Sequence, residues 1–247
     1  MEFNNKCSRA NKHDTKNMTE KYIKATFLNE SKHRFICNVL KEQIEIECYV
    51  SSSSKLSKYL PLENNNLLIS ENTGKKLRTQ YTLEAVEYDN SWYYVNFNQV
   101  NRLYQNYLLT CKQISIDEIN REKFVANKIK TDFWIDNIGC VEVKALLSTT
   151  GDICFPDTSA NRIERQILYY IEVLKEGIAV TFAFVNMCDN LTGFRFDDKK
   201  KFIQEYFKEA VALGLKIKAY SIIYEENYFK IVENIKLEEN IIKAVSS

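Results

Sequence analysis

Two acidic residues and a lysine lie on two short segments joined by a tight turn. Residues 131–133 and 140–144 carry β-branched and aromatic side chains on either side of a turn cluster, which predicts a β-hairpin. Side chains alternate between faces along a strand, so Glu142 and Lys144 are expected on one face, with Asp132 of the partner strand converging on it. Two carboxylates beside an ammonium group can hold a hard divalent cation, which is the chemistry of a metal-dependent phosphodiesterase.

The same three charges also have a plainer explanation. A Glu-Val-Lys triplet is common in strands, where it usually forms a solvated face with a weak cross-strand ion pair. Here the neighbouring residues 140–141 and 145–147 are apolar, so the charges interrupt a strand that is otherwise expected to be buried. Charged groups are rarely placed in such a strand without a partner or a metal ion, and we therefore favour the metal site.

The composition is typical of a soluble protein that folds as one large domain or two modest ones. The chain has 247 residues, of which 45% are hydrophobic and 27% are charged. Its formal net charge is only +1, so the overall electric field is weak. A polyanionic partner would therefore have to be met by local basic patches.

The cysteines and the N-terminal residues indicate a cytoplasmic protein. The seven cysteines are scattered without a Cys-x-x-Cys spacing, so neither a zinc site nor a disulfide framework is expected. Residues 1–18 are polar and mixed in charge, and we expect a loosely attached tail. No apolar run is long enough to span a membrane, so we expect no membrane partner. The sequence does not indicate an oligomeric state.

The first half of the chain predicts a small all-β barrel. Short segments with alternating apolar residues are separated by polar breaks, which is typical of closely spaced strands. The expected strands are residues 22–28, 34–40, 44–50, 67–69, 82–86 and 92–97.

The second half predicts a mixed α/β domain. Residues 158–176 show apolar side chains at helical spacing, and Gly177 ends that helix. The continuous apolar run 178–187 is typical of a central strand, and it is followed by an amphipathic helix at 197–213 and a strand at 215–223. Together with the hairpin, this order describes an α/β sheet that can carry the carboxylates.

At this level of detail the chain resembles the sugar fermentation stimulation protein A (SfsA) family. The matching pieces occur in the family's order, over about residues 20–225. They are residues 25–27 with 34–35, 95–96 with 101–103, 131–133 with 142–144, and 155–157 with 162. The resemblance implies an α/β (α+β) fold with a polar tail at 1–18, an OB-like nucleic-acid-binding β-barrel at 19–110, and a PD-(D/E)XK nuclease-like α/β domain with a mixed central sheet at 111–247.

Several positions depart from the family pattern. The segment Val-Ser-Ser-Ser-Ser at 50–54 stands where the family has a Pro-Asn-Thr-Gly loop, and residues 162–166 replace its Arg-Gly-x-Lys-His helix. Lys130 replaces an arginine of the family pattern, which keeps the positive charge but loses the planar, bidentate guanidinium group. Arg121, or Glu122 beside it, aligns with a family glutamate. The chain is thus a divergent relative whose metal site is complete and whose substrate contacts differ.

The resemblance and the residues together assign roles at the hairpin. Asp132 and Glu142 would coordinate Mg²⁺ or Mn²⁺, joined by the backbone carbonyl of Val143. The ion would polarise the scissile phosphate and lower the pKa of an attacking water. Lys144 would orient that water or stabilise the growing negative charge.

Six basic residues are candidates for contacts with DNA and/or RNA. Those in the barrel are Lys75, Lys76 and Arg78, and those in the second domain are Lys130, Arg162 and Arg165. Arg162 and Arg165 lie at the start of a helix, which also favours phosphate, although a solvated helix face explains them nearly as well. Aromatic residues of the barrel, namely Tyr81, Trp92, Tyr93 and Tyr94, are either stacking platforms for bases or core residues.

Two functions remain open on the sequence. An intact Asp132, Glu142 and Lys144 set favours a metal-dependent nuclease that hydrolyses phosphodiester bonds. The altered helix and barrel loop favour a non-catalytic DNA-binding or regulatory protein linked to sugar metabolism, in line with the family resemblance. A purely structural scaffold would leave three costly charges in a buried hairpin unexplained.

Overall fold

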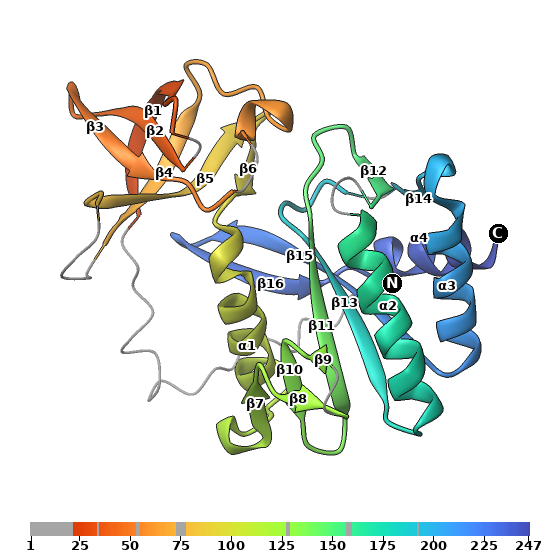
Figure 1. Ribbon diagram of the computed structural model, residues 1–247. Helices are drawn as coiled ribbons and strands as arrows, with labels where there is room; N and C mark the ends of the chain where they lie inside the picture. The colour runs from red at the N-terminus through yellow and green to blue at the C-terminus, as the bar shows by residue number, and fades with distance from the viewer. Residues whose placement is uncertain are drawn as a thin grey trace, which may run out of the picture.

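The computed structural model describes residues 22–33, 35–52, 55–72, 78–126, 129–156, 160–191 and 193–247. Within these residues the strands form two six-stranded sheets and two short two-stranded sheets. The first six-stranded sheet belongs to the N-terminal part of the chain, at the upper left of Figure 1, and the second lies beside four α-helices. No helix in the described part of the chain has the length and apolar character needed to cross a membrane.

The first sheet closes into the predicted small β-barrel. Its order is β3-β2-β1-β4-β5-β6, and β3 also pairs with β5 in parallel, through Cys48 with Tyr81 and Tyr49 with Thr82. The strands are β1 (Ile23–Glu30), β2 (Ile36–Lys41), β3 (Ile44–Tyr49), β4 (Asn66–Glu71), β5 (Tyr81–Tyr88) and β6 (Ser91–Tyr94). They confirm the six strands expected from the alternation. The β2–β3 and β5–β6 connections are two-residue turns with both residues at positive φ, as tight hairpins require.

The second sheet is mixed, as the sequence predicts. Its order is β16-β15-β13-β11-β10-β7, with parallel pairs around β13 and antiparallel pairs at both edges. Its strands are β7 (Ile119–Arg121), β10 (Phe133–Ile135), β11 (Gly139–Leu146), β13 (Val180–Asn186), β15 (Lys216–Glu225) and β16 (Tyr228–Glu233). The short strands are β8 (Phe124–Val125), β9 (Ile129–Lys130), β12 (Asp152–Phe155) and β14 (Gly193–Phe196). Every residue of β13 is buried, which explains its continuous apolar run.

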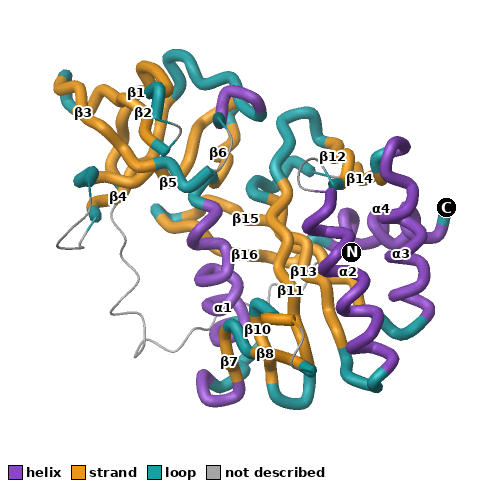
Figure 2. The backbone as a smooth tube through the Cα atoms, viewed as in Figure 1, coloured by secondary structure: helices purple, strands orange, loops and turns teal. Residues whose placement is uncertain are grey.

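Helices cover both faces of the second sheet (Figure 2). They are α1 (Val100–Thr110), α2 (Ala160–Lys175), α3 (Lys201–Ala212) and α4 (Ile235–Ser246), with short 3-10 turns at Leu56–Lys58, Phe97–Gln99, Ile116–Glu118 and Asp198–Lys200. Because strand side chains alternate, Phe182 and Phe184 pack with α2, α3 and α4, whereas Ala183 and Val185 face the core shared with α1.

The barrel and the second sheet share one hydrophobic core. Barrel residues such as Leu67 and Tyr94 belong to the same buried cluster as Val185 and Phe229. The Tyr94 and Phe229 rings are 4.7 Å apart, and the Tyr94 backbone N–H donates to the Met187 carbonyl at 2.8 Å. The two parts therefore pack directly on one another.

Helix α1 was not predicted. The expected barrel extends to residue 110, but Tyr104 of α1 packs on Phe133 and Tyr220 of the second sheet, with ring centroids 5.6 and 5.3 Å apart. This packing favours a domain boundary before Val100, which we propose in place of residue 110. The predicted polar tail at 1–18 lies outside the described residues.

Candidate active site

Asp132 lies in a bend between two strands. The residue pattern predicts a strand at Asp132, which is wrong, since β9 ends at Lys130 and β10 begins at Phe133. The Thr131 side chain holds the bend: it is fully buried, and its hydroxyl bonds to the carbonyls of Phe133 and Val141, both at 3.1 Å. Thr131 therefore turns the chain out of the sheet, so that the Asp132 side chain is not held in a strand.

The bend brings the Asp132 carboxylate to the edge of β11. The pairing of β10 with β11 stops at Phe133 and Val141, and the next outward N–H of β11, that of Val143, donates to Asp132 Oδ2 at 2.8 Å. The other oxygen, Oδ1, accepts from Asn101 Nδ2 of α1 at 3.0 Å. The N–H and C=O of one strand residue point to the same side, so the Val143 carbonyl faces Asp132 as well.

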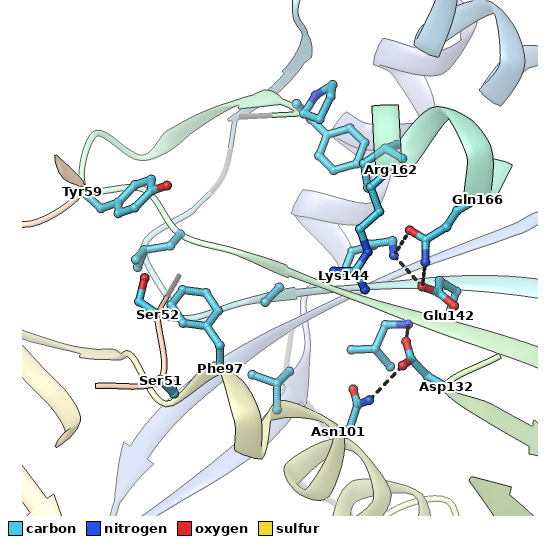
Figure 3. Close-up of a pocket in the computed structure, with 17 residues that line it drawn as sticks. Ser51, Ser52, Tyr59, Phe97, Asn101, Asp132, Glu142, Lys144, Arg162 and Gln166 are labelled. Carbon is cyan, nitrogen blue, oxygen red and sulfur yellow. Dashed lines mark hydrogen bonds and ion pairs between the residues drawn. The ribbon is translucent and has the colours of Figure 1, made fainter. Parts of the chain in front are cut away.

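Glu142 is anchored by three donors, two of which, Lys144 and Gln166, are joined to it by dashed lines in Figure 3. The carboxylate is only 3% exposed. Its Oε1 accepts from Lys144 Nζ at 2.5 Å and from Gln166 Nε2 at 2.8 Å, and its Oε2 accepts from the Tyr170 hydroxyl at 2.6 Å. Gln166 Oε1 in turn accepts from Lys144 Nζ at 2.8 Å. Glu142 and Lys144 thus lie on one face of β11, as the alternation predicts.

The surroundings of Asp132 disfavour its charged form. Burial raises the pKa of Asp132 above its ordinary value, and the negative charge of Glu142 raises it further. The Val143 N–H, the Lys144 ammonium and the Asn101 amide act in the opposite direction without cancelling the shift. Burial, followed by the Glu142 charge, also raises the pKa of Tyr170, which keeps its hydroxyl protonated as a donor.

These groups open into a cleft of about 410 Å³ between the barrel and the second sheet. We call it the carboxylate cleft. Its floor carries Asp132, Glu142 and Lys144, and the start of α2 contributes Arg162 and Gln166. The barrel side contributes Ser51, Ser52, Tyr59 and Phe97. A polar cleft of this size with acidic and basic groups at its floor suits a charged ligand such as a phosphodiester.

The other predicted nucleic-acid contacts are dispersed. Arg165 lies away from the carboxylate cleft, in a surface cleft with Leu168 and Glu172, and its Nε donates to the Asn161 carbonyl at 3.3 Å. Lys130 is exposed and forms an ion pair with Glu122 at 2.5 Å. Of the predicted basic contacts that the structure describes, Arg162 alone lines the carboxylate cleft.

None of the barrel candidates that the structure describes lines the carboxylate cleft. Lys75 and Lys76 lie outside the described residues, and Arg78 lines a second cleft within the barrel. Of the aromatic candidates, Tyr93 and Tyr94 are 2% and 1% exposed, so they are core residues. The Tyr81 ring is covered by Lys41, whose Nζ also donates to its hydroxyl at 3.0 Å.

Three residues around the carboxylates were given no role from the sequence: Asn101 and Gln166 line the carboxylate cleft, and Tyr170 is buried next to Glu142. A usable signal existed on α2, because Arg162, Gln166 and Tyr170 are spaced four residues apart and so share one helix face. Asn101 belongs to the helix that was not predicted, and the signal it offered was the family resemblance at residues 101–103.

The residues fit a divalent metal ion. Asp132, Glu142 and the Val143 carbonyl supply hard oxygen atoms on one side of the β11 edge, which are the donors that Mg²⁺ and Mn²⁺ prefer. Among the described residues no group of three or more histidine, cysteine or acidic side chains could hold a metal. A metal here would therefore rest on two carboxylates and keep several of its waters.

Comparisons with known proteins agree with this architecture. A family model described as the sugar fermentation stimulation protein RE domain matches residues 98–228, which are thus a restriction endonuclease-like domain. A sugar fermentation stimulation protein homolog of Picosynechococcus sp. is 28% identical over 166 residues, covering 61% of this chain and 66% of the relative. A homolog of Microcystis aeruginosa is 24% identical over 169 residues, covering 63% and 70%.

A solved structure shares the fold. SfsA of Pyrococcus furiosus, determined in complex with Ca²⁺, matches with a TM-score of 0.67 and 18% sequence identity, covering 86% of this chain and 93% of that protein. It has the same order of an N-terminal β-barrel and a mixed α/β domain with four helices. The RE-domain model alone matches more than half of the residues of the present chain. The chain therefore belongs to the sugar fermentation stimulation protein (SfsA) family.

Proposed function

We propose that this protein is a divalent-metal-dependent nuclease that hydrolyses phosphodiester bonds of DNA and/or RNA in the cytoplasm. The observation that carries the proposal is the convergence of Asp132, Glu142 and Lys144 in one cleft of a restriction endonuclease-like domain. The Ca²⁺ complex of the Pyrococcus furiosus relative supports a divalent ion in this family.

Asp132 and Glu142, with the Val143 carbonyl, would hold Mg²⁺ or Mn²⁺. When bound, such an ion polarises the phosphate and lowers the pKa of a water in its shell. The Asn101 and Tyr170 hydrogen bonds fix the two carboxylates, so that the oxygens point into the cleft before substrate arrives.

Lys144 and Arg162 are the positively charged groups that interact with the phosphate. The Lys144 ammonium is held by Glu142 and Gln166, which places a positive charge at the cleft floor beside the carboxylates. There it orients the attacking water or stabilises negative charge on the phosphate oxygens. Arg162 lines the same cleft and can bind a phosphate oxygen through its guanidinium fork.

The test removes the charge of Glu142 and the charge of Lys144 in two separate variants. Glu142→Gln keeps the shape of the side chain but removes a negative charge, so metal affinity falls and metal-dependent cleavage falls by orders of magnitude. Lys144→Met abolishes cleavage without lowering metal affinity, because the amine acts on the reacting groups and its loss removes a positive charge beside Glu142. Cleavage is measured on labelled single- and double-stranded DNA and RNA, with and without Mg²⁺ or Mn²⁺, and metal affinity by calorimetry.

A matched control lies on the surface of α2. Glu172 and Lys175 form an exposed ion pair at 3.2 Å, outside the carboxylate cleft. Glu172→Gln and Lys175→Met make the same chemical changes and are expected to leave cleavage at the wild-type rate. Equal residual activity in the wild type and in both cleft variants would identify a contaminant and end the nuclease proposal.

A non-catalytic nucleic-acid-binding protein is the second candidate. It is favoured by the close Lys144–Glu142 pair, since an ammonium at 2.5 Å already compensates the charge that a metal would neutralise. In that case the wild type binds oligonucleotides and cleaves none of the substrates in either metal.

A further inference from the structure

The barrel contains a second cleft that the proposed hydrolysis does not use. It has a volume of about 640 Å³ and is larger than the carboxylate cleft. Its walls come from the segment after β1, the end of β3, the start of β5 and residues 96–99. We call it the barrel cleft.

An aromatic pair forms one wall of the barrel cleft. The rings of Phe35 and Tyr49 lie nearly parallel, with an interplanar angle of 23° and centroids 6.4 Å apart. Phe35 is 36% exposed, so part of its ring is accessible to a ligand in the cleft. The Tyr49 hydroxyl is held by Asn98 Nδ2 at 3.3 Å, which limits the movement of that ring. A fixed, partly exposed ring pair of this kind offers a flat face for another flat group.

The polar groups of the barrel cleft suit an anion that carries a heterocycle. Arg78 and His33 line it, and among its described lining residues none is acidic. Asn98 and Gln99 bring carboxamides, which both donate and accept hydrogen bonds as the edges of nucleobases do. The carboxylate cleft, by contrast, carries Asp132 and Glu142 at its floor.

The two clefts adjoin along the same two segments of the chain. Tyr49 lines the barrel cleft, and Ser51 and Ser52, two and three residues on, line the carboxylate cleft. Residues 96–101 likewise alternate between them, because Asn98 and Gln99 face the barrel cleft whereas Phe97 and Asn101 face the other. A ligand long enough to pass over these segments can occupy both.

We propose that the barrel cleft binds an unpaired nucleobase of a single-stranded nucleic acid, with its aromatic face on Phe35 and its neighbouring phosphate near Arg78. The inference rests on the proposed function for the rest of the strand, which continues into the carboxylate cleft. A base inside a duplex is stacked and paired, so its face cannot reach an aromatic side chain unless it leaves the helix. The protein therefore prefers single strands.

Binding is tested without metal, so that cleavage plays no part. Fluorescence anisotropy with a labelled single strand, the blunt duplex of the same sequence, and an abasic strand of equal length is measured in the presence of a chelator, for DNA and for RNA. The single strand is expected to bind more tightly than either the duplex or the abasic strand, since only it offers a free base.

The Phe35→Ala variant separates stacking from charge. It should weaken single-strand binding about tenfold, the loss that removal of one base–aromatic stack gives. Phe124→Ala removes an even more exposed ring on β8, far from the barrel in sequence, and should bind as the wild type does. Tyr49→Phe keeps the ring and should retain most of the affinity. Equal affinity of Phe35→Ala and wild type, with both folded by circular dichroism, would overturn the proposal.

Photocrosslinking of the wild type avoids any question of folding. An oligonucleotide with 5-iodouracil should crosslink to the peptide that contains Phe35 or Tyr49, and crosslinks confined to other peptides would contradict the inference. The two proposals fail separately: crosslinking at Phe35 without cleavage in any metal removes the nuclease and keeps the base site, whereas cleavage with equal affinity for single strand and duplex does the reverse.

Discussion

At the scale of single residues, the Tyr170 hydroxyl decides which oxygen of Glu142 remains open. Oε1 already accepts two hydrogen bonds, from Lys144 and Gln166, and these occupy both of its lone pairs. Within the described residues Oε2 accepts from Tyr170 alone, so it is the oxygen that can turn a lone pair toward a metal. Tyr170 thus fixes the direction of that lone pair.

Replacing Tyr170 with Phe should lower Mn²⁺ affinity about 10- to 100-fold, the usual effect of losing a partner of a metal ligand. The fold should persist, because the ring still packs on Phe182 with centroids 5.4 Å apart. Calorimetric titration with Mn²⁺ measures the effect. Tyr169→Phe, at an exposed position of the same helix, is the matched control and should titrate as the wild type. Identical titrations of both variants would remove the anchoring role of Tyr170.

Asp132 should destabilise the metal-free protein at neutral pH. Its pKa is raised in the folded chain, so ionising it costs more there than in the unfolded chain. This cost is absent below the ordinary pKa of 3.8 and is fully present once the pH exceeds the raised value. Asp132→Asn avoids the charge, and the Asn101 amide can rotate to present its oxygen to the new side chain.

We therefore expect Asp132→Asn to raise the melting temperature at pH 7 by about 2–4 °C, the shift that about 1 kcal/mol gives in a chain of this size. The difference should vanish near pH 3, and Mn²⁺ should stabilise the wild type alone. Asp136→Asn changes an exposed carboxylate of the same hairpin and should melt as the wild type does at both pH values. A lower melting temperature for Asp132→Asn at pH 7 would contradict the argument.

At the scale of elements, the β10–β11 hairpin depends on Gly139. This residue has φ +95°, and a Cβ atom there would lie 2.3 Å from the Ala179 carbonyl oxygen. The same oxygen accepts the Cys140 N–H at 2.9 Å, which starts the pairing of β11 with β13. A side chain at position 139 would push apart the two strands that carry the site.

Gly139→Ala should therefore destabilise the protein by about 1–3 kcal/mol more than a glycine replacement with strained φ alone, since it adds overpacking against backbone. Gly214→Ala provides that comparison, because Gly214 has φ +103° and no atom within 4 Å of the added Cβ. Urea unfolding of the two variants measures the difference. Equal free energies of unfolding would show that the backbone at Ala179 yields without cost.

The strands were predictable from the sequence and the first helix was not, for physical reasons. Alternation along strands such as β1 reflects one buried face, and the apolar runs of β4 and β5 reflect burial on both faces, so the local pattern records the strands. Helix α1 reads Val-Asn-Arg-Leu-Tyr-Gln-Asn-Tyr-Leu-Leu-Thr, where asparagine and tyrosine are poor helix formers, and its stability comes from ring contacts of Tyr104 and Tyr107 with Tyr220. Those contacts join residues more than 100 positions apart.

The same dependence on long-range contacts explains which parts of the candidate site could be predicted from the sequence. Glu142 and Lys144 follow from strand alternation, which is a local rule. The partners of Glu142 on α2 depend on how that helix crosses the sheet, and Tyr170 is apolar enough to be taken for core. The bend at Asp132 depends on the buried hydroxyl of Thr131, whose two acceptors include a residue of the neighbouring strand.

At the scale of the whole molecule, the shared core predicts a single unfolding transition. The chain has two tryptophans: Trp92 lies on β6 of the barrel, against Tyr224 of the second sheet, and Trp134 lies on β10 near the opposite edge of that sheet. Trp92→Phe and Trp134→Phe therefore leave one reporter each. The two single-tryptophan variants should show coincident fluorescence and circular dichroism midpoints within each protein, because neither part buries the common cluster alone. Separate fluorescence and circular dichroism transitions would show that the barrel and the sheet unfold independently.

The common core also fixes the distance between the barrel cleft and the carboxylate cleft. Because Tyr94, Met187 and Phe229 lock the barrel onto the second sheet, the barrel cleft and the carboxylate cleft keep a constant separation. A base seated on Phe35 and a phosphodiester beside Asp132 would then be separated by a fixed number of nucleotides. The protein would act as a molecular ruler, whose products are defined by their distance from the bound base and not by a sequence at the point of cleavage.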